Sequence, residues 1–220
     1  MKLSALNSIC FLLLLSSCTY YAYKQDVPYA ASGFMDIHSQ EWFEGSTNCL
    51  FNTSIEIFKN RYSGLLVIKN EISGSNRVVL VTEFGLKIFD MEFFPGGDFR
   101  FHYCMDAINK NYIINMLRKD FALIFKSRPS KGSSVMLEER KTGGPVLKEK
   151  ENAMKYYFYI DANTGRVNSI IKASPLGKKT RAYFYGKEGN VPDSVRIEHY
   201  NIKLNIKLDL IDENLPSADA

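Results

Sequence analysis

The segment from Asn201 to Leu210 alternates apolar and polar residues without a break, and this constrains the fold more than any other feature. Its apolar positions are Ile202, Leu204, Ile206, Leu208 and Leu210. Successive side chains of a strand point to opposite faces, so this pattern predicts a strand with one buried face and one wet face. Such strands are typical of an antiparallel sheet.

Similar short segments, separated by turn signals, fill most of residues 51–210 and give about eleven predicted strands. The apolar parity slips between Leu86 and Phe93, which predicts a β-bulge. Residues 106–125 change to helical spacing, and the apolar stripe there consists of Ile113, Met116, Leu117, Phe121 and Ile124. The sequence therefore predicts a mainly β, α+β fold with one central helix that packs its stripe against the sheet.

The N-terminus combines a charged start at Lys2 with an apolar run of about ten residues, too short to span a bilayer. The run ends in "LSSC", residues 15–18, which resembles the lipobox of bacterial lipoproteins. That resemblance implies cleavage before Cys18 and attachment of acyl chains to its sulfur. Thr19 follows, and Asp at that position would signal retention in the inner membrane. We therefore expect a lipid anchor in the outer membrane with the domain facing the periplasm.

This interpretation divides the chain into four parts. They are a signal peptide at 1–17, a lipidated tether at 18–48, one β-domain at 49–212 and a tail at 213–220.

The composition excludes several classes of function. A net charge of +4, from 28 basic and 24 acidic residues, is too balanced for a nucleic-acid-binding protein. The three histidines, His38, His102 and His199, are scattered, and His199 has the parity of an inward-facing residue. No metal-binding, phosphate-binding or hydrolase motif is present. We predict no enzyme, no metal and no cofactor. We interpret Lys178, Lys179 and Arg181 as solvated charge, with contact to anionic headgroups or to a partner as the alternative.

Two cysteines, Cys49 and Cys104, remain after Cys10 is removed with the leader and Cys18 is acylated. A disulfide between them would close a loop of about 55 residues and stabilise the fold by roughly 4 kcal/mol. Two separate buried thiols are the alternative.

Two longer stretches carry a family resemblance. The C-terminal "VPDSVRIEHYNIKLNIKLDLID" looks like the last hairpin of LolB-type outer-membrane lipoprotein receptors, and "YSGLLVIKNEISGSNRVVLVTEFGLKIFDMEFFPGG" is similar to their early strands. The resemblance covers roughly residues 50–212. It implies an unclosed antiparallel β-barrel, plugged by the helix, with an apolar cavity for the acyl chains of lipids or lipoproteins. A soluble LolA-like carrier is the implied partner, and Phe94 is the candidate for a membrane-contacting loop.

The aromatic content fits either a filled core or an acyl-chain cavity, and both remain open here. The cavity candidates are Phe89, Met91, Phe93, Phe99, Phe101, Tyr103, Ile113, Met116, Leu117 and Phe121. We predict a lipid-anchored protein that binds acyl chains and assists lipoprotein reception or insertion at the outer membrane. The alternative is a scaffolding lipoprotein whose packed barrel binds a protein partner.

Overall fold

The structure is a computed structural model of the chain. It describes residues 27–28, 42–43, 48–126, 134–138, 144–186 and 191–213. Cys18, its signal sequence and His38 lie outside these ranges.

A single antiparallel sheet of 13 strands forms the body of the protein. The strands are β1 (Val27–Pro28), β2 (Cys49–Ile57), β3 (Asn60–Asn70), β4 (Asn76–Val81), β5 (Lys87–Phe93), β6 (Phe99–Cys104), β7 (Ser134–Glu138), β8 (Pro145–Glu151), β9 (Met154–Ile160), β10 (Val167–Ser174), β11 (Gly177–Tyr185), β12 (Ser194–His199) and β13 (Leu204–Asp212). Their order is β1-β7-β8-β9-β10-β11-β12-β13-β2-β3-β4-β5-β6, so β1 and β6 are the two edges. The sheet is not closed.

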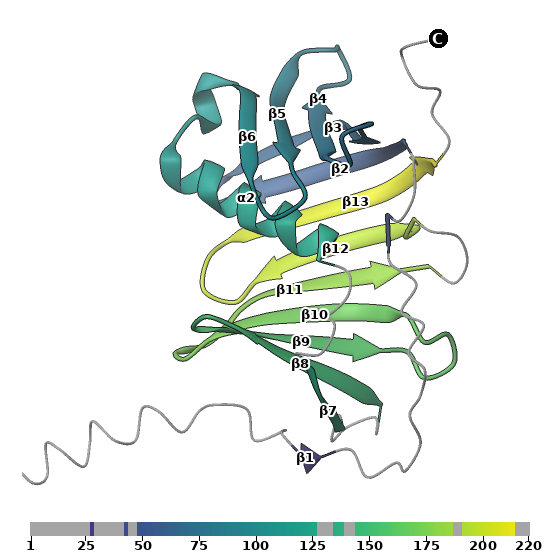
Figure 1. Cartoon of the computed structure of the whole chain (residues 1–220). Helices are drawn as coiled ribbons and strands as arrows, with labels where there is room; N and C mark the ends of the chain where they lie inside the picture. The colour runs from purple at the N-terminus through teal and green to yellow at the C-terminus, as the bar shows by residue number, and fades with distance from the viewer. Residues whose placement is uncertain are drawn as a thin grey trace, which may run out of the picture.

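The order follows from a meandering chain that starts in the middle of the sheet. Strands β2 to β6 run outward to one edge, and β7 to β13 begin near the other edge and return to pair β13 with β2. Figure 1 shows the sheet curving around the helix α2 (Asn111–Phe125), which connects the two halves. The mainly β fold with one central helix, and an unclosed barrel that the helix plugs, is confirmed.

Helix α2 carries the predicted apolar stripe. Ile113, Leu117, Phe121 and Ile124 are buried, and Met116 packs against the same core. The ring of Phe121 lies 5.8 Å from that of Phe89 in β5. The predicted helix began too early, because Asp106–Ile108 form a separate 3-10 turn, and α2 starts at Asn111.

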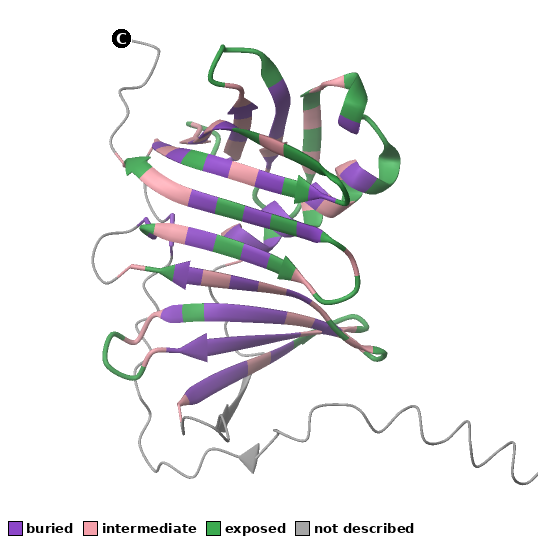
Figure 2. Cartoon of the chain, turned by 180° about the vertical axis from the view of Figure 1, so that it is seen from behind, coloured by how far each residue is buried: buried purple, intermediate pink, exposed green. Residues whose placement is uncertain are grey.

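Burial alternates cleanly in β13, where Leu204, Ile206 and Leu208 face the core. Figure 2 shows this alternation in the middle strands, and more continuous burial in β8 to β10. A second buried cluster, including Tyr157 and Ile171, lies on the face of β8 to β10 opposite the main core.

Two irregularities in the ladder shift side chains between faces. Leu80 pairs with Phe89 and Val81 with Lys87, so Ile88 is an extra residue in β5. This is the bulge that the parity slip predicted. In β6, Asp90 pairs with Tyr103 and Met91 with Phe101, so His102 is extra there.

The segment before residue 49 contributes to the core. Trp42 is buried, donates its indole N–H to the carbonyl of Val167 at 2.9 Å and stacks on Phe184. Phe43 packs edge-on against Phe125 at the end of α2. These contacts place Trp42 and Phe43 of the predicted tether in the folded domain, in addition to strand β1, which pairs with β7.

Candidate functional site

A hollow with a volume of about 530 Å³ lies where the two halves of the sheet approach each other over the C-terminal half of α2. We call it the mouth cavity. It is lined by Gly74, Asn76, Phe93, Phe94, Pro95, Gly97, Asp98, Phe99, Arg118, Lys119, Ala122, Leu123, Phe125, Lys126, Glu151, Tyr156 and Lys172. Its volume falls in the range of small-molecule binding sites.

Helix α2 supplies the floor because residues three and four apart share one side of a helix. Arg118, Ala122 and Phe125 form one such row, and Lys119, Leu123 and Lys126 form the next. The buried stripe holds the helix against the sheet, so these neighbouring rows are turned toward the cavity. Ala122 is small and exposed, which leaves space at the centre of the floor.

Aromatic rings from both halves of the chain form the walls. Phe93 packs at 5.2 Å from Phe99 and at 5.3 Å from Phe125, which joins the β5–β6 hairpin to the helix. Tyr156 faces them from β9, and its side chain is buried. Burial raises the pKa of Tyr156 to about 12, with Glu151 and Glu149 adding to the effect. The phenol is therefore neutral and adds to the apolar surface.

Cations outnumber carboxylates in the lining. Arg118, Lys119, Lys126 and Lys172 contribute positive charge, and Asp98 and Glu151 contribute negative charge. The Lys126 ammonium lies 3.2 Å from both Glu149 and Glu151. The ammonium groups of Lys126 and Lys172 also lie 4.8 and 5.7 Å from the centroid of the Tyr156 ring. The cavity thus combines an aromatic wall with a basic rim.

The structure brings two of the predicted cavity residues, Phe93 and Phe99, to the mouth cavity. The others are placed elsewhere. Phe89, Met91, Ile113, Leu117 and Phe121 are fully or almost fully buried between α2 and the sheet. Phe101 and Met116 pack against that core without lining the cavity.

Tyr103 lies on the opposite face of the sheet. The extra residue His102 reverses the parity, so Tyr103 pairs with Asp90, and the Lys87 ammonium lies 5.9 Å from its ring. Simple alternation from Phe99 and Phe101 could not reveal this reversal. The sequence did not indicate the other side chains that build the cavity. They are Phe125 and Tyr156, together with the cations Arg118, Lys119, Lys126 and Lys172.

Phe94 lies at the rim of the cavity in the β5–β6 turn and is partly buried, with the Arg100 guanidinium 5.2 Å from its ring. The neighbouring β3–β4 turn carries a fully exposed residue, Ile72. Gly74 brings the two turns together, since a Cβ there would lie 3.5 Å from the Pro95 ring.

Cys49 and Cys104 are not joined by a disulfide. Cys49 is in β2 and Cys104 in β6, with β3, β4 and β5 between them in the sheet. Neighbouring strands lie about 4.8 Å apart, far too much in sum for a disulfide. The alternative of two separate thiols therefore describes this structure, and the bridge does not.

His199 faces inward as its parity predicted and meets a carboxylate. Its Nε2 lies 2.9 Å from Asp120 of α2, and its Nδ1 lies 3.5 Å from the Thr180 hydroxyl. Burial raises the pKa of Asp120, and the hydrogen bond with His199 opposes that rise. This hydroxyl, imidazole and carboxylate are not among the residues that line the mouth cavity.

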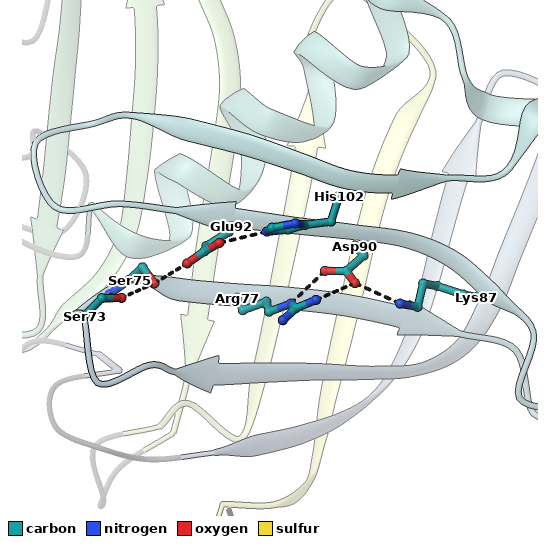
Figure 3. Close-up of polar contacts among 7 residues, drawn as sticks. All are labelled: Ser73, Ser75, Arg77, Lys87, Asp90, Glu92 and His102. Carbon is teal, nitrogen blue, oxygen red and sulfur yellow. Dashed lines mark hydrogen bonds and ion pairs between the residues drawn. The ribbon is translucent and has the colours of Figure 1, made fainter. Parts of the chain in front are cut away.

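A polar network covers the face of β4 to β6 that is turned away from α2 (Figure 3). Asp90 accepts hydrogen bonds from Arg77 at 2.9 and 3.0 Å and from Lys87 at 2.9 Å. Glu92 accepts one from the Ser75 hydroxyl at 2.6 Å and lies 2.8 Å from His102. These contacts tie neighbouring strands together behind the cavity wall.

Within the described ranges, no helix is both long and apolar enough to cross a membrane. The same part of the chain holds no group of three or more His, Cys, Asp or Glu side chains arranged to bind a metal ion.

Comparisons with known proteins give likenesses of structure only. No protein-family profile matches the sequence, and no curated protein matches it. A LolA superfamily protein from Nitrosomonas europaea aligns at 8% identity and a TM-score of 0.48, over 80% of this chain and 89% of that one. A putative outer membrane lipoprotein-sorting protein domain from Vibrio parahaemolyticus aligns at 10% identity and a TM-score of 0.45, over 81% and 88%.

A third solved structure, of a DUF1329 family protein from Desulfovibrio piger, aligns at 11% identity and a TM-score of 0.44, over 80% of this chain and 89% of that one.

Proposed function

We propose that this protein binds the acyl chain of a lipid or lipoprotein in the mouth cavity. The observation that carries the proposal is the aromatic lining of that cavity, formed by Phe93, Phe99, Phe125 and Tyr156. Burying apolar surface contributes about 25 cal/mol per Å², so a flexible hydrocarbon chain gains more from such walls than a polar ligand does. No described catalytic motif competes for the site.

The place of the cavity favours a binding function over a purely structural one. The core beneath α2 is packed with buried side chains such as Leu117 and Phe121. The hollow lies beside it, where the unclosed sheet leaves the helix uncovered, and the small residue Ala122 keeps the floor free. A barrel that served only as a scaffold would gain stability by filling this space.

The proposal also covers where the protein acts. Cys18 follows a lipobox-like sequence, so we propose an acyl anchor there that holds the domain at the outer membrane, facing the periplasm. A protein held in that way, with a cavity open to solvent, suits the reception or insertion of lipoproteins. A soluble carrier of the LolA type is the proposed partner.

A cavity-filling substitution tests the proposal without disturbing the core. The full chain carrying Cys18→Ser would be used, so that no acyl chain of its own competes for the cavity. Ala122→Trp places an indole in the middle of the floor, and Asn115→Trp places the same side chain on an exposed position of α2 outside the cavity. Thermal unfolding would show that both variants fold.

The measurement is displacement of a fluorescent fatty acid by dodecyl maltoside. We expect the parent chain and Asn115→Trp to bind the probe with equal affinity, and Ala122→Trp to lose at least tenfold, equivalent to about 1.4 kcal/mol. Equal binding by all three chains, or binding by none, would refute the proposed function.

A further inference from the structure

The mouth cavity holds more positive charge than its walls neutralise. Of its four cations, Lys126 has two carboxylate partners, Glu149 and Glu151, each at 3.2 Å. Among the described residues, no side-chain hydrogen bond or ion pair is found for the other three, Arg118, Lys119 and Lys172. An apolar cavity that served only for packing would gain nothing from such groups.

Two of the three carboxylates that could neutralise these cations, Asp120 and Glu151, are already engaged. Asp120 follows Lys119 in the helix, but its oxygens lie 2.9 and 3.0 Å from His199. Glu151 is half-exposed and pairs with Lys126. Asp98 completes the acidic residues of the lining and is exposed in the β5–β6 turn. The free cations therefore remain available to a ligand.

Arg118 is held in a position to donate. Its guanidinium carbon lies 5.8 Å from the centroid of the Phe99 ring, which supports the side chain against the cavity wall. Its Nε atom is buried and has no hydrogen-bond partner in the structure. A buried donor without an acceptor is unfavourable. Arg118 as a residue lines the cavity, so an oxyanion bound there would accept hydrogen bonds from the exposed part of the same guanidinium.

Lys172 is poised in a similar way on the opposite wall. Its ammonium lies 5.7 Å from the centroid of the Tyr156 ring, and no side-chain hydrogen bond or ion pair is found for it among the described residues. Burial lowers the pKa of Lys172, and the neighbouring charges of Lys119 and Arg118 lower it further, against Asp120 and Glu151. All three cations line the same cavity. An anion between them would relieve their repulsion.

We propose that Arg118, Lys119 and Lys172 form a subsite for the anionic headgroup of the amphiphile, with a phosphate or carboxylate as the group that binds. This inference rests on the proposed function and adds the class of ligand to it. The acyl chain lies along the aromatic wall, and the headgroup lies at the basic rim. Arginine and lysine donate charge-assisted hydrogen bonds to oxyanions, which are stronger than those to neutral groups.

The experiment compares ligands that share a chain and differ in charge. The full chain with Cys18→Ser is titrated by calorimetry at low salt with dodecyl phosphate, dodecyl maltoside and inorganic phosphate. Both dodecyl compounds are kept below their critical micelle concentrations. The test variant is Arg118→Gln with Lys172→Gln. The matched control is Lys59→Gln with Lys203→Gln, which removes two exposed cations that do not line the cavity. Thermal unfolding confirms that both variants fold.

We expect the parent chain and the control to bind dodecyl phosphate at least about tenfold more tightly than dodecyl maltoside. The test variant should lose this preference and keep its affinity for dodecyl maltoside. The preference should also weaken as salt is added, because exposed parts of the rim are screened.

The other outcomes separate the two proposals. Equal affinity of the parent chain for both amphiphiles would overturn the anion subsite and leave acyl-chain binding in place. No binding of either amphiphile would overturn the proposed function and this inference with it. Inorganic phosphate could instead bind as tightly as dodecyl phosphate and lose its affinity in the test variant. The three cations would then form a site for a free anion, and the proposed headgroup subsite would be overturned.

Discussion

The imidazole of His199 lies 2.9 Å from the carboxylate of Asp120, which joins the middle of α2 to strand β12. Both side chains are almost completely buried. The two residues are far apart in the sequence, so this contact fixes the helix against a strand of the second half of the sheet. It also fixes the neighbouring residues Arg118 and Lys119, which line the mouth cavity on the next side of the helix.

Replacing His199 with Ala should make stability depend on pH through Asp120. The Asp120 carboxyl stays buried in the variant, and burial raises its pKa. The hydrogen bond with His199, which opposes that rise in the parent chain, is lost. A group whose folded pKa is raised contributes its full stability below the unfolded pKa of about 3.9 and loses it as the pH rises through the folded pKa. The free energy of unfolding should therefore decline from pH 4 toward pH 8 relative to a chain without this carboxyl.

The reference for this measurement is the double variant His199→Ala with Asp120→Asn. Urea unfolding of both chains across this pH range gives the difference that belongs to Asp120. We expect it to reach roughly 1 to 3 kcal/mol, the cost of an unsatisfied buried group. Parallel pH profiles of the two chains would show that Asp120 is hydrated in the folded protein.

Asp90 should make the free energy of unfolding depend on pH in the opposite direction to Asp120. Burial raises its pKa, but the hydrogen bonds from Arg77 and Lys87 outweigh burial and hold the pKa below its usual value. A lowered folded pKa contributes stability above the unfolded pKa of about 3.9 and loses it as the pH falls through the folded pKa. Arg77 and Lys87 are each about two-fifths exposed, so solvent screens part of the interaction.

We expect Asp90→Asn to cost roughly 1 to 3 kcal/mol at pH 7, the range for hydrogen bonds to charged groups. The cost should shrink as the pH is lowered past 4. Glu83→Gln in the exposed β4–β5 turn is the control and should change stability by less than about 0.5 kcal/mol. If Asp90→Asn cost the same free energy of unfolding down to pH 2, the hydrogen bonds from Arg77 and Lys87 would not be what stabilises the ionised form of Asp90.

Leu117 tests the role of α2 as the plug of the sheet. Its side chain is completely buried. Leu117→Ala should destabilise the domain by roughly 2 to 5 kcal/mol, because a packed site loses apolar contacts and keeps a cavity. Asn115→Ala, on the exposed side of the same helix, should stay within about 0.5 kcal/mol of the parent chain. Chemical unfolding that showed a similar, small loss for both would mean that α2 does not close the core.

Much of this fold could be predicted from local patterns. The alternation of β13, the apolar stripe of α2 and the bulge at Ile88 each depend on residues that are close in the sequence. The first residue of α2 could not be predicted from apolar spacing alone. The spacing continues through Asp106–Ile108, but these residues form a separate 3-10 turn and the helix begins after them. The second irregularity, at His102, left no break in the apparent alternation and moved Tyr103 to the other face.

The site was less predictable because its parts come from distant segments. Phe93 and Phe99 flank one hairpin and could be recognised together. Lys172 reaches the cavity only because the curved sheet brings β10 opposite α2, and nothing in the sequence near it signals that position. The basic cluster that sequence reasoning had noted, at Lys178, Lys179 and Arg181, does not line the cavity.

The two thiols provide a chemical test of the strand order. Burial raises the pKa of Cys49 to about 12, with the charges of Glu213 and Asp212 adding to it, and burial also raises the pKa of Cys104. The thiolate is the reactive form, so both should react slowly with iodoacetamide at pH 8 in the folded protein. Both should be alkylated in urea without a reducing agent. A peptide map with a Cys49–Cys104 cross-link would refute the sheet order, in which three strands separate them.

The last prediction concerns the anchor. Cys18→Ala should leave the precursor without a lipid, because only the cysteine sulfur can accept the diacylglyceryl group. Cys10→Ala is the matched control, since this cysteine lies within the proposed signal peptide and should be removed in either chain. Two or more buried acyl chains hold a protein stably on a membrane, so the parent chain and Cys10→Ala should sediment with membranes.

Cys18→Ala should lose this membrane association while its domain keeps the same unfolding midpoint. The domain should be unaffected because the buried residues Trp42 and Phe43 lie more than twenty residues after Cys18, and among the described residues only the two-residue edge strand β1 lies nearer to it. Mass spectrometry of the mature parent chain supplies the decisive measurement. An N-terminus at any residue other than an acylated Cys18 would show that the protein reaches its membrane in another way.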